Sequence, residues 1–121
     1  MSTRANILVK DQHDQLWFYS HCDGYPSGTL PLLEKFMEWV KAGKIRDNVG
    51  QASGWLIILG ALEYKSVPAA KYDNDDFANL QWDSVSTPDD FKVGAIEPTT
   101  GQHGDIEYLY TVDLHNKTIS Y

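Results

Sequence analysis

The residue types best suited to nucleophilic chemistry stand together at His21-Cys22-Asp23, where a thiol lies between an imidazole and a carboxylate. A cysteine becomes an effective nucleophile when a neighbouring base takes its proton. Consecutive residues of a strand point to opposite faces, however, so His21 is poorly placed to activate Cys22. We therefore interpret the thiol as a small buried side chain and predict no catalytic residue here.

A second set with chemical potential alternates along the chain at His103, Asp105 and Glu107. If all three lie on one strand they share a face, where they could hold a metal ion or act as an acid–base pair. This pattern supports one alternative function, a small metal-assisted hydrolase. The loop-forming composition from Pro98 to Gly104 favours a simpler interpretation, a solvent-exposed strand face, so we expect neither metal nor cofactor.

A third candidate site surrounds the expected start of a helix at Asp47 or Asn48, both of which are good helix caps. The free backbone N–H groups and the positive end of the helix dipole attract anions at such a position. Lys44 and Arg46 stand alongside, so the segment could hold a phosphate without a dedicated motif. The carboxylate of Asp47 could instead occupy the helix end itself.

Aromatic side chains are numerous, and those that could stack on a nucleobase include Trp17 and Tyr19, which share one strand face. Most of the others are expected in the core: Tyr25, Trp39, Trp55, Trp82, Tyr108 and Tyr110. The sequence contains no phosphate-binding Walker loop, dinucleotide fingerprint, zinc knuckle or nucleophile elbow. The aromatic residues therefore indicate a possible stacking surface and no particular enzyme class.

The first half of the chain predicts a β-hairpin followed by two helices. Residues 5–10 and 16–20 have strand composition, and the polar Asp11–Asp14 segment between them is typical of a turn. A helix is expected from Thr29, as its cap, to about Lys41, with Pro31 in the first turn and Gly43 just beyond the end. The second helix is expected to end near Tyr64.

The second half of the chain predicts four strands, at residues 80–85, 91–97, 105–114 and 117–121. The segment 105–114 has the clearest alternation, with one apolar face formed by Ile106, Tyr108, Tyr110, Val112 and Leu114. The order ββααββββ predicts an α+β fold: a single domain, residues 1–121, with a mainly antiparallel sheet and two helices packed on one face.

Charge and composition limit the function classes further. The 121-residue chain has a net charge of −7, which disfavours binding to nucleic acids and anionic membranes. Residues 71–90 contain six Asp and one basic residue, a composition that suits an acidic inhibitor of a basic protein such as a nucleic-acid-binding protein. No apolar run reaches the ~20 residues of a membrane span, and the lone cysteine suits a reducing cytoplasm.

Several segments resemble a group of small phage and prophage proteins. They are Thr3-Arg4-Ala5-Asn6-Ile7, where Ala5 replaces the usual serine, the segment Tyr19-x-His21-x-Asp23-Gly24-Tyr25-Pro26-Ser27-Gly28, and residues 105–112. The resemblance implies a phage origin and an intracellular role during infection, and it marks Arg4, His21, Asp23 and Tyr25 as shared positions. These residues could form a ligand-binding cluster, or Arg4 and Asp23 could only lock the hairpin to the following turn.

We therefore predict a non-enzymatic phage protein that counters host defence in the host cytoplasm by sequestering a small nucleotide signal, in the manner of viral sponge proteins. A homo-oligomer is expected, because a small domain has little room for a deep pocket of its own. The alternatives are the acidic protein–protein inhibitor and the metal-assisted hydrolase. The predicted ligand-binding residues are Arg4, His21, Asp23, Tyr25, Lys44, Arg46 and Asn48.

Overall fold

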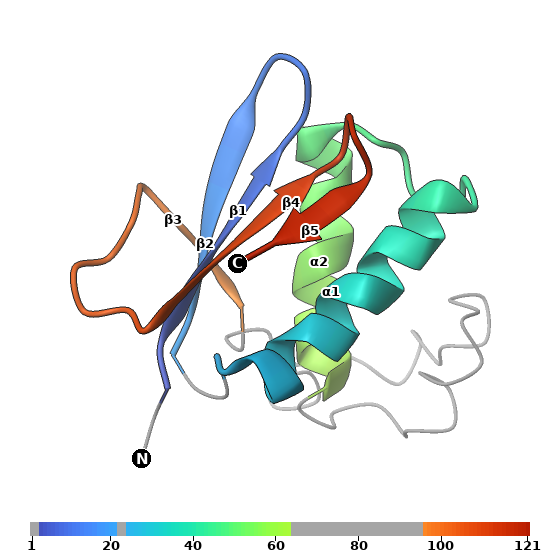
Figure 1. Cartoon of the computed structure of the whole chain (residues 1–121). Coiled ribbons are helices and arrows are strands. Elements are labelled where there is room, and N and C mark those ends of the chain that lie inside the picture. Colours follow the sequence, from blue (N-terminus) through green and yellow to red (C-terminus); the bar gives the residue numbers. More distant parts are fainter. Residues whose placement is uncertain (1–2, 22–23, 64–95) are drawn as a thin grey trace, which may run out of the picture.

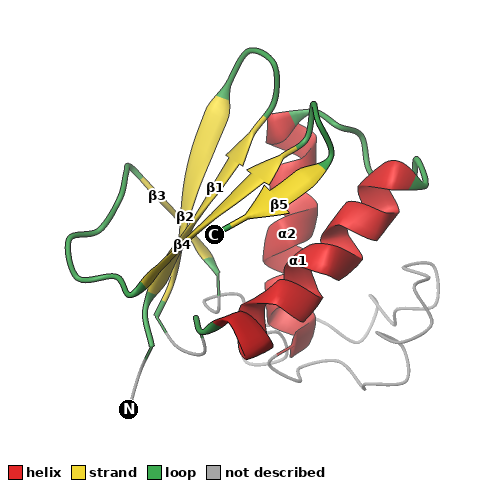
Figure 2. Cartoon of the chain, in the orientation of Figure 1, coloured by secondary structure: helices red, strands yellow, loops and turns green. Residues whose placement is uncertain are grey.

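The computed structural model describes residues 3–21, 24–63 and 96–121, which form a five-stranded sheet and a pair of helices (Figures 1 and 2). In chain order the elements are β1 (Ala5–Lys10), β2 (Gln15–Ser20), α1 (Pro26–Lys41), α2 (Val49–Glu63), β3 (Glu97–Thr99), β4 (Tyr108–Asp113) and β5 (Thr118–Ser120). Both helices lie on the same side of the sheet (Figure 1). The predicted α+β class is confirmed.

The sheet has the strand order β3-β2-β1-β4-β5, and every neighbouring pair is antiparallel except β1 and β4. These two central strands run parallel, with Ile7 beside Tyr110. The expectation of a mainly antiparallel sheet is therefore confirmed, with this parallel pair at its centre. Three strands follow the helices in the described residues, and the strand expected at 80–85 lies outside them.

The first hairpin forms as its sequence predicts. The alternate residues Ala5, Ile7 and Val9 of β1 are fully buried against the helices, which fixes the face that the strand presents to the core. The turn closes through a hydrogen bond of 3.0 Å from the backbone N–H of Asp11 to the carbonyl of Asp14. The hairpin thus carries its turn to one end of the sheet, away from the chain segments that enter β1 and leave β2.

Helix α1 begins at Pro26, about one turn before the expected cap, so the assignment of Thr29 as the cap is wrong. Tyr25 is extended, and its carbonyl accepts the N–H groups of Gly28 and Thr29, each at 3.0 Å. Proline is well suited to the first helical position, because its fixed φ fits the helix and its missing N–H would have had no partner there. Thr29 is instead a buried residue inside the helix.

Helix α1 has one apolar face, because Leu33, Phe36, Met37 and Val40 recur at helical spacing and are all buried. The helix ends at Lys41, and Gly43, predicted to lie just beyond the end, has a φ of +77° and follows the C-cap Ala42. A residue without a side chain adopts this left-handed conformation at little cost.

The second helix confirms the expected start, since α2 begins at Val49, directly after Asn48. Its buried residues include Val49, Ala52, Leu56 and Leu59, which follow one face of the helix. Gly60 permits a close approach of another segment, because a Cβ there would lie 3.0 Å from the Ile96 side chain. Gly54 does not serve this purpose, because a Cβ there would meet nothing within 4 Å.

The last strands are shorter than their apolar patterns suggest. The alternation that predicted a strand over 105–114 gives β4, which begins at Tyr108, and Tyr110, Val112 and Leu114 fill the core as expected. The loop expected from Pro98 is partly wrong, because residues 97–99 form the edge strand β3. Pro98 is tolerated there because an edge strand leaves one side of its backbone unpaired. The strand expected at 117–121 forms the other edge, β5.

Candidate functional site

The predicted ligand-binding residues do not form one site, because the structure places them at opposite ends of the sheet. Arg4, His21 and Tyr25 lie where β1 begins and β2 ends. Arg46 and Asn48 lie at the other end, beside the first hairpin turn, since the N–H of Val49 donates to Asp11. Asp23 lies outside the described residues.

The residues at the first end have structural partners of their own. Arg4 forms an ion pair of 3.5 Å with Asp105, but both side chains are well exposed, at 37% and 61%, so the pair contributes about 0–1 kcal/mol. The Nδ1 atom of His21 is hydrogen-bonded to the Tyr19 hydroxyl at 3.0 Å. Tyr25 supplies the backbone carbonyl that starts α1.

The proposed set of His103, Asp105 and Glu107 is wrong as a shared strand face, because all three precede β4. The ring of His103 instead stacks on Tyr19, with ring centroids 4.0 Å apart and planes within 9°. Among the described residues, no group of three or more His, Cys, Asp or Glu side chains could hold a metal ion. The stacking face of Tyr19 is therefore taken by the protein itself.

A buried amide anchors this loop to the sheet. The side chain of Asn6 is fully buried, donates to the carbonyl of Phe18 at 2.8 Å and accepts the N–H of His103 at 2.7 Å. Both bonds connect segments that are distant in sequence, so Asn6 sets the path of the loop before β4. Its position in the Thr3–Ile7 segment gives that part of the sequence a structural explanation.

The opposite end of the sheet carries a polar cavity, which we call the turn-end cavity. Its volume is about 270 Å³, and three chain segments enclose it: the first hairpin turn, the residues before α2 and the turn between β4 and β5. The lining residues are Asp11, Gln12, His13, Arg46, Asp47, Asn48 and His115. Two of the predicted binding residues, Arg46 and Asn48, thus face one space, whereas Lys44 does not line it.

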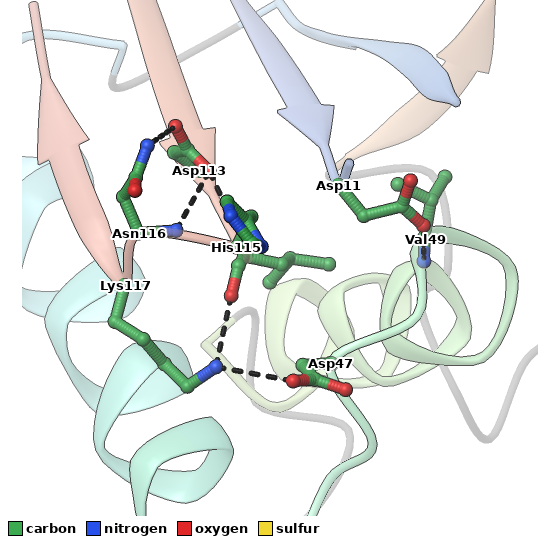
Figure 3. Close-up of polar contacts among 8 residues, drawn as sticks. Asp11, Asp47, Val49, Asp113, His115, Asn116 and Lys117 are labelled. Atoms are coloured by element: carbon green, nitrogen blue, oxygen red, sulfur yellow. Dashed lines mark hydrogen bonds and ion pairs between the residues drawn. The ribbon is translucent and has the colours of Figure 1, made fainter. Parts of the chain in front are cut away.

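Asp11 joins two of the three segments. Its Oδ1 accepts the N–H groups of His13 and Asp14 at 2.7 and 2.8 Å, and its Oδ2 accepts the N–H of Val49 at 3.0 Å (Figure 3). These backbone hydrogen bonds, that of Val49 first, lower the pKa of Asp11 to about 2. The carboxylate is therefore charged at neutral pH and holds the hairpin turn against the first turn of α2.

Lys117 joins the third segment to the same helix end. Its Nζ donates to Asp47 Oδ2 at 3.2 Å and to the carbonyl of Leu114 at 2.9 Å, and Figure 3 shows this bridge below His115. Lys117 also has a φ of +59°, a left-handed conformation that is uncommon for a residue with a side chain. The turn before it is closed by Asp113, whose pKa is lowered chiefly by the N–H of Asn116.

The start of α2 is already occupied, which corrects the predicted anion site. Asp11 accepts the N–H of Val49, and Asn48 caps the helix through its Oδ1, which accepts the N–H of Gln51 at 3.1 Å. The expectation that a residue of this chain could fill the helix end is right, but the residue is Asp11 rather than Asp47. An Asp that ends a strand and is followed by polar residues is typical of a turn closed by its own side chain, so the turn at Asp11 could be predicted. The contact with Val49 could not, because that residue follows 38 positions later.

The fold and the site define a two-layer α+β domain with a polar cavity between three turns. The sequence matches no known family model, and no similar chain was found among curated proteins or solved structures. Within residues 3–21, 24–63 and 96–121, no helix has the length and apolar character needed to cross a bilayer.

Proposed function

We propose that this protein is a non-enzymatic binding protein that holds a small nucleotide-like ligand in the turn-end cavity. One observation carries the proposal: the cavity brings Arg46 and Asn48 together with the imidazole rings of His13 and His115. A guanidinium recognises phosphate, an amide pairs with polar base edges, and flat rings stack on bases. The lining therefore offers each type of contact that a nucleotide needs.

The biological setting of the proposal comes from the resemblance to small phage proteins. A phage protein that sequesters a host signalling nucleotide in the host cytoplasm would need affinity and abundance, and no bond-breaking machinery. The part of the chain that the structure describes carries no metal-binding cluster, which leaves the hydrolase alternative without a supporting observation there. The acidic-inhibitor alternative depends on the Asp-rich segment, which lies outside the described residues.

Native mass spectrometry of the tagged protein recovered from host cells tests the proposal, because it reports bound small molecules and the assembly state together. We expect a retained nucleotide and a homo-oligomer. Calorimetry with cyclic, linear and ADP-ribose-type nucleotides then measures the affinity. If recovered protein carries no ligand and none of these nucleotides binds at tens of micromolar protein, the proposed function is wrong.

A further inference from the structure

The two carboxylates and one amide oxygen at the turn-end cavity already accept hydrogen bonds. Both carboxylate oxygens of Asp11 accept backbone N–H groups. Asp47 accepts the ammonium group of Lys117 through its Oδ2, and the Oδ1 of Asn48 accepts the N–H of Gln51. An incoming cation would have to compete with Lys117 for Asp47 and with backbone N–H groups for Asp11. A cationic ligand is therefore disfavoured in spite of the two carboxylates.

The donors around the cavity are in the opposite state. Within the described residues, the guanidinium of Arg46 makes no hydrogen bond or ion pair, and the side-chain amide of Gln12 and the rings of His13 and His115 make no hydrogen bond. The Nδ2 group of Asn48 likewise makes no hydrogen bond within the described residues, because this side chain bonds to Gln51 through its oxygen. Five donor-bearing side chains thus face one space with their donors available.

The charges at the cavity do not exclude an anion, although the whole chain has a net charge of −7. Lys117 pairs with Asp47 at 3.2 Å, so this carboxylate is offset locally. The charge of Asp11 is spread over three backbone N–H groups. Arg46 is then the one charged group of the lining without such a partner in the described residues. A guanidinium in this state pairs well with phosphate oxygens.

The size of the cavity limits the ligand. Its volume of about 270 Å³ lies just below the roughly 300–1,000 Å³ of typical small-molecule sites. A group of mononucleotide size or smaller is therefore the largest that the space can surround. A cyclic dinucleotide is larger than such a group, and its phosphodiesters carry no terminal phosphate.

We infer that the turn-end cavity binds a phosphate monoester of mononucleotide size, with the terminal phosphate on Arg46 and on the side-chain amide of Asn48. This inference rests on the proposed function and specifies its ligand class. The bridges made by Asp11 and Lys117 hold the three enclosing turns in place before the ligand arrives (Figure 3). Such preorganisation reduces the ordering cost of binding.

Titration of the ¹⁵N-labelled full chain, followed by amide chemical shifts, tests the inference with four probes. They are adenosine 5′-monophosphate, adenosine, inorganic phosphate and a cyclic dinucleotide. We expect the monophosphate and inorganic phosphate to move the signals of residues 11–13, 46–48 and 115–117, with the monophosphate binding more tightly. Adenosine alone is expected to leave these signals unchanged, because it has no charge for the guanidinium. The two phosphates together separate a nucleotide site from a simple phosphate site.

The variant Arg46→Gln should weaken monophosphate binding tenfold or more while leaving the folded spectrum intact, since the side chain is exposed. Lys41→Gln removes the same charge from the exposed last turn of α1, outside the cavity, and should change the affinity less than twofold. Adenosine binding as tightly as the monophosphate, tighter binding of the cyclic dinucleotide, or equal losses in the two variants would overturn the inference. The first two of these results would leave the proposed nucleotide-binding function standing. If no probe binds and the protein recovered from cells carries no ligand, both the inference and the proposed function are wrong.

Discussion

The phenol of Tyr110 provides the sharpest test of what holds the two layers together. Its hydroxyl donates to the carbonyl of Gly24 at 2.6 Å, and both residues are buried. This bond connects β4 to the segment that leads into α1, 86 residues away in sequence. The side chain of Thr29 also hydrogen-bonds the phenol. Tyr110→Phe keeps the ring and removes the hydroxyl, so it leaves these buried partners without their donor or acceptor.

The expected loss follows from the cost of an unsatisfied buried polar group, about 1–3 kcal/mol. With a urea m-value of about 1–3 kcal/mol/M, the unfolding midpoint should fall by about 1 M. Tryptophan fluorescence during urea unfolding at pH 7 measures this midpoint. Tyr121→Phe is the matched control, because it removes the same hydroxyl from a residue that is 69% exposed, and it should cost less than about 0.5 kcal/mol.

The pH dependence adds a second arm to this experiment. Burial raises the pKa of Tyr110 above its ordinary value of 10.0. Because the folded value is the higher one, the contribution of the neutral phenol is complete below pH 10 and is lost as the pH rises through the folded value. The difference between the wild type and Tyr110→Phe should therefore shrink above pH 10. Equal stability of the two proteins at pH 7 would show that the phenol does not anchor β4 to α1.

Four further changes test the packing of α2 and the contact between Asp11 and the start of α2. Gly54→Ala should stabilise the protein by about 1 kcal/mol in thermal unfolding, because alanine favours the helix and the new Cβ meets no neighbour. Gly60→Ala should destabilise the protein, because the new Cβ meets the Ile96 side chain at 3.0 Å. The opposite ranking of the two variants would contradict the close approach of Ile96 to α2. Ser53→Ala should stabilise the protein by up to about 1 kcal/mol in the same assay, because the buried Oγ of Ser53 has no hydrogen-bond partner in the described residues. A clear loss of stability would show that this hydroxyl does make a hydrogen bond. Asp11→Asn should lower the urea midpoint of unfolding at pH 7. The midpoint of the variant should also fall less than that of the wild type between pH 3.8 and about 2, because the lowered pKa of Asp11 makes its charged carboxylate stabilising above that window. An acid profile equal to that of the wild type would show that this carboxylate does not hold the hairpin turn against α2.

The parts of the fold that could be predicted are those with a strong local period. The helix faces at Leu33–Val40 and Val49–Leu59 and the buried face of β4 follow from residue spacing alone. The parallel pairing of β1 with β4 could not be predicted, because alternation shows which side of a strand is buried and gives no information about its neighbour. The start of α1 was misplaced because Thr29 is a favourable cap type, whereas the extended Tyr25 and Pro26 form the actual start.

The candidate site was predicted only in part, for a related reason. Arg46 and Asn48 could be found because they stand next to a helix start, which is a local signal. Asp11 was missed as their neighbour, because the contact with Val49 spans 38 residues and depends on how the hairpin lies against α2. Arg4, His21 and Tyr25 were grouped with them through the family resemblance, and the strand directions then separate the two groups.

The parallel pair at the centre of the sheet also determines when this chain can complete its fold. β1 is made well before β4, so the edge of β1 that pairs with β4 lacks this partner until residues 108–113 have been added. Until then, its backbone donors and acceptors on that side are open to any other strand, including β4 of a neighbouring copy. Strand exchange between nascent or refolding copies is therefore the misassembly route that this topology favours, and slow, concentration-dependent refolding is its expected signature.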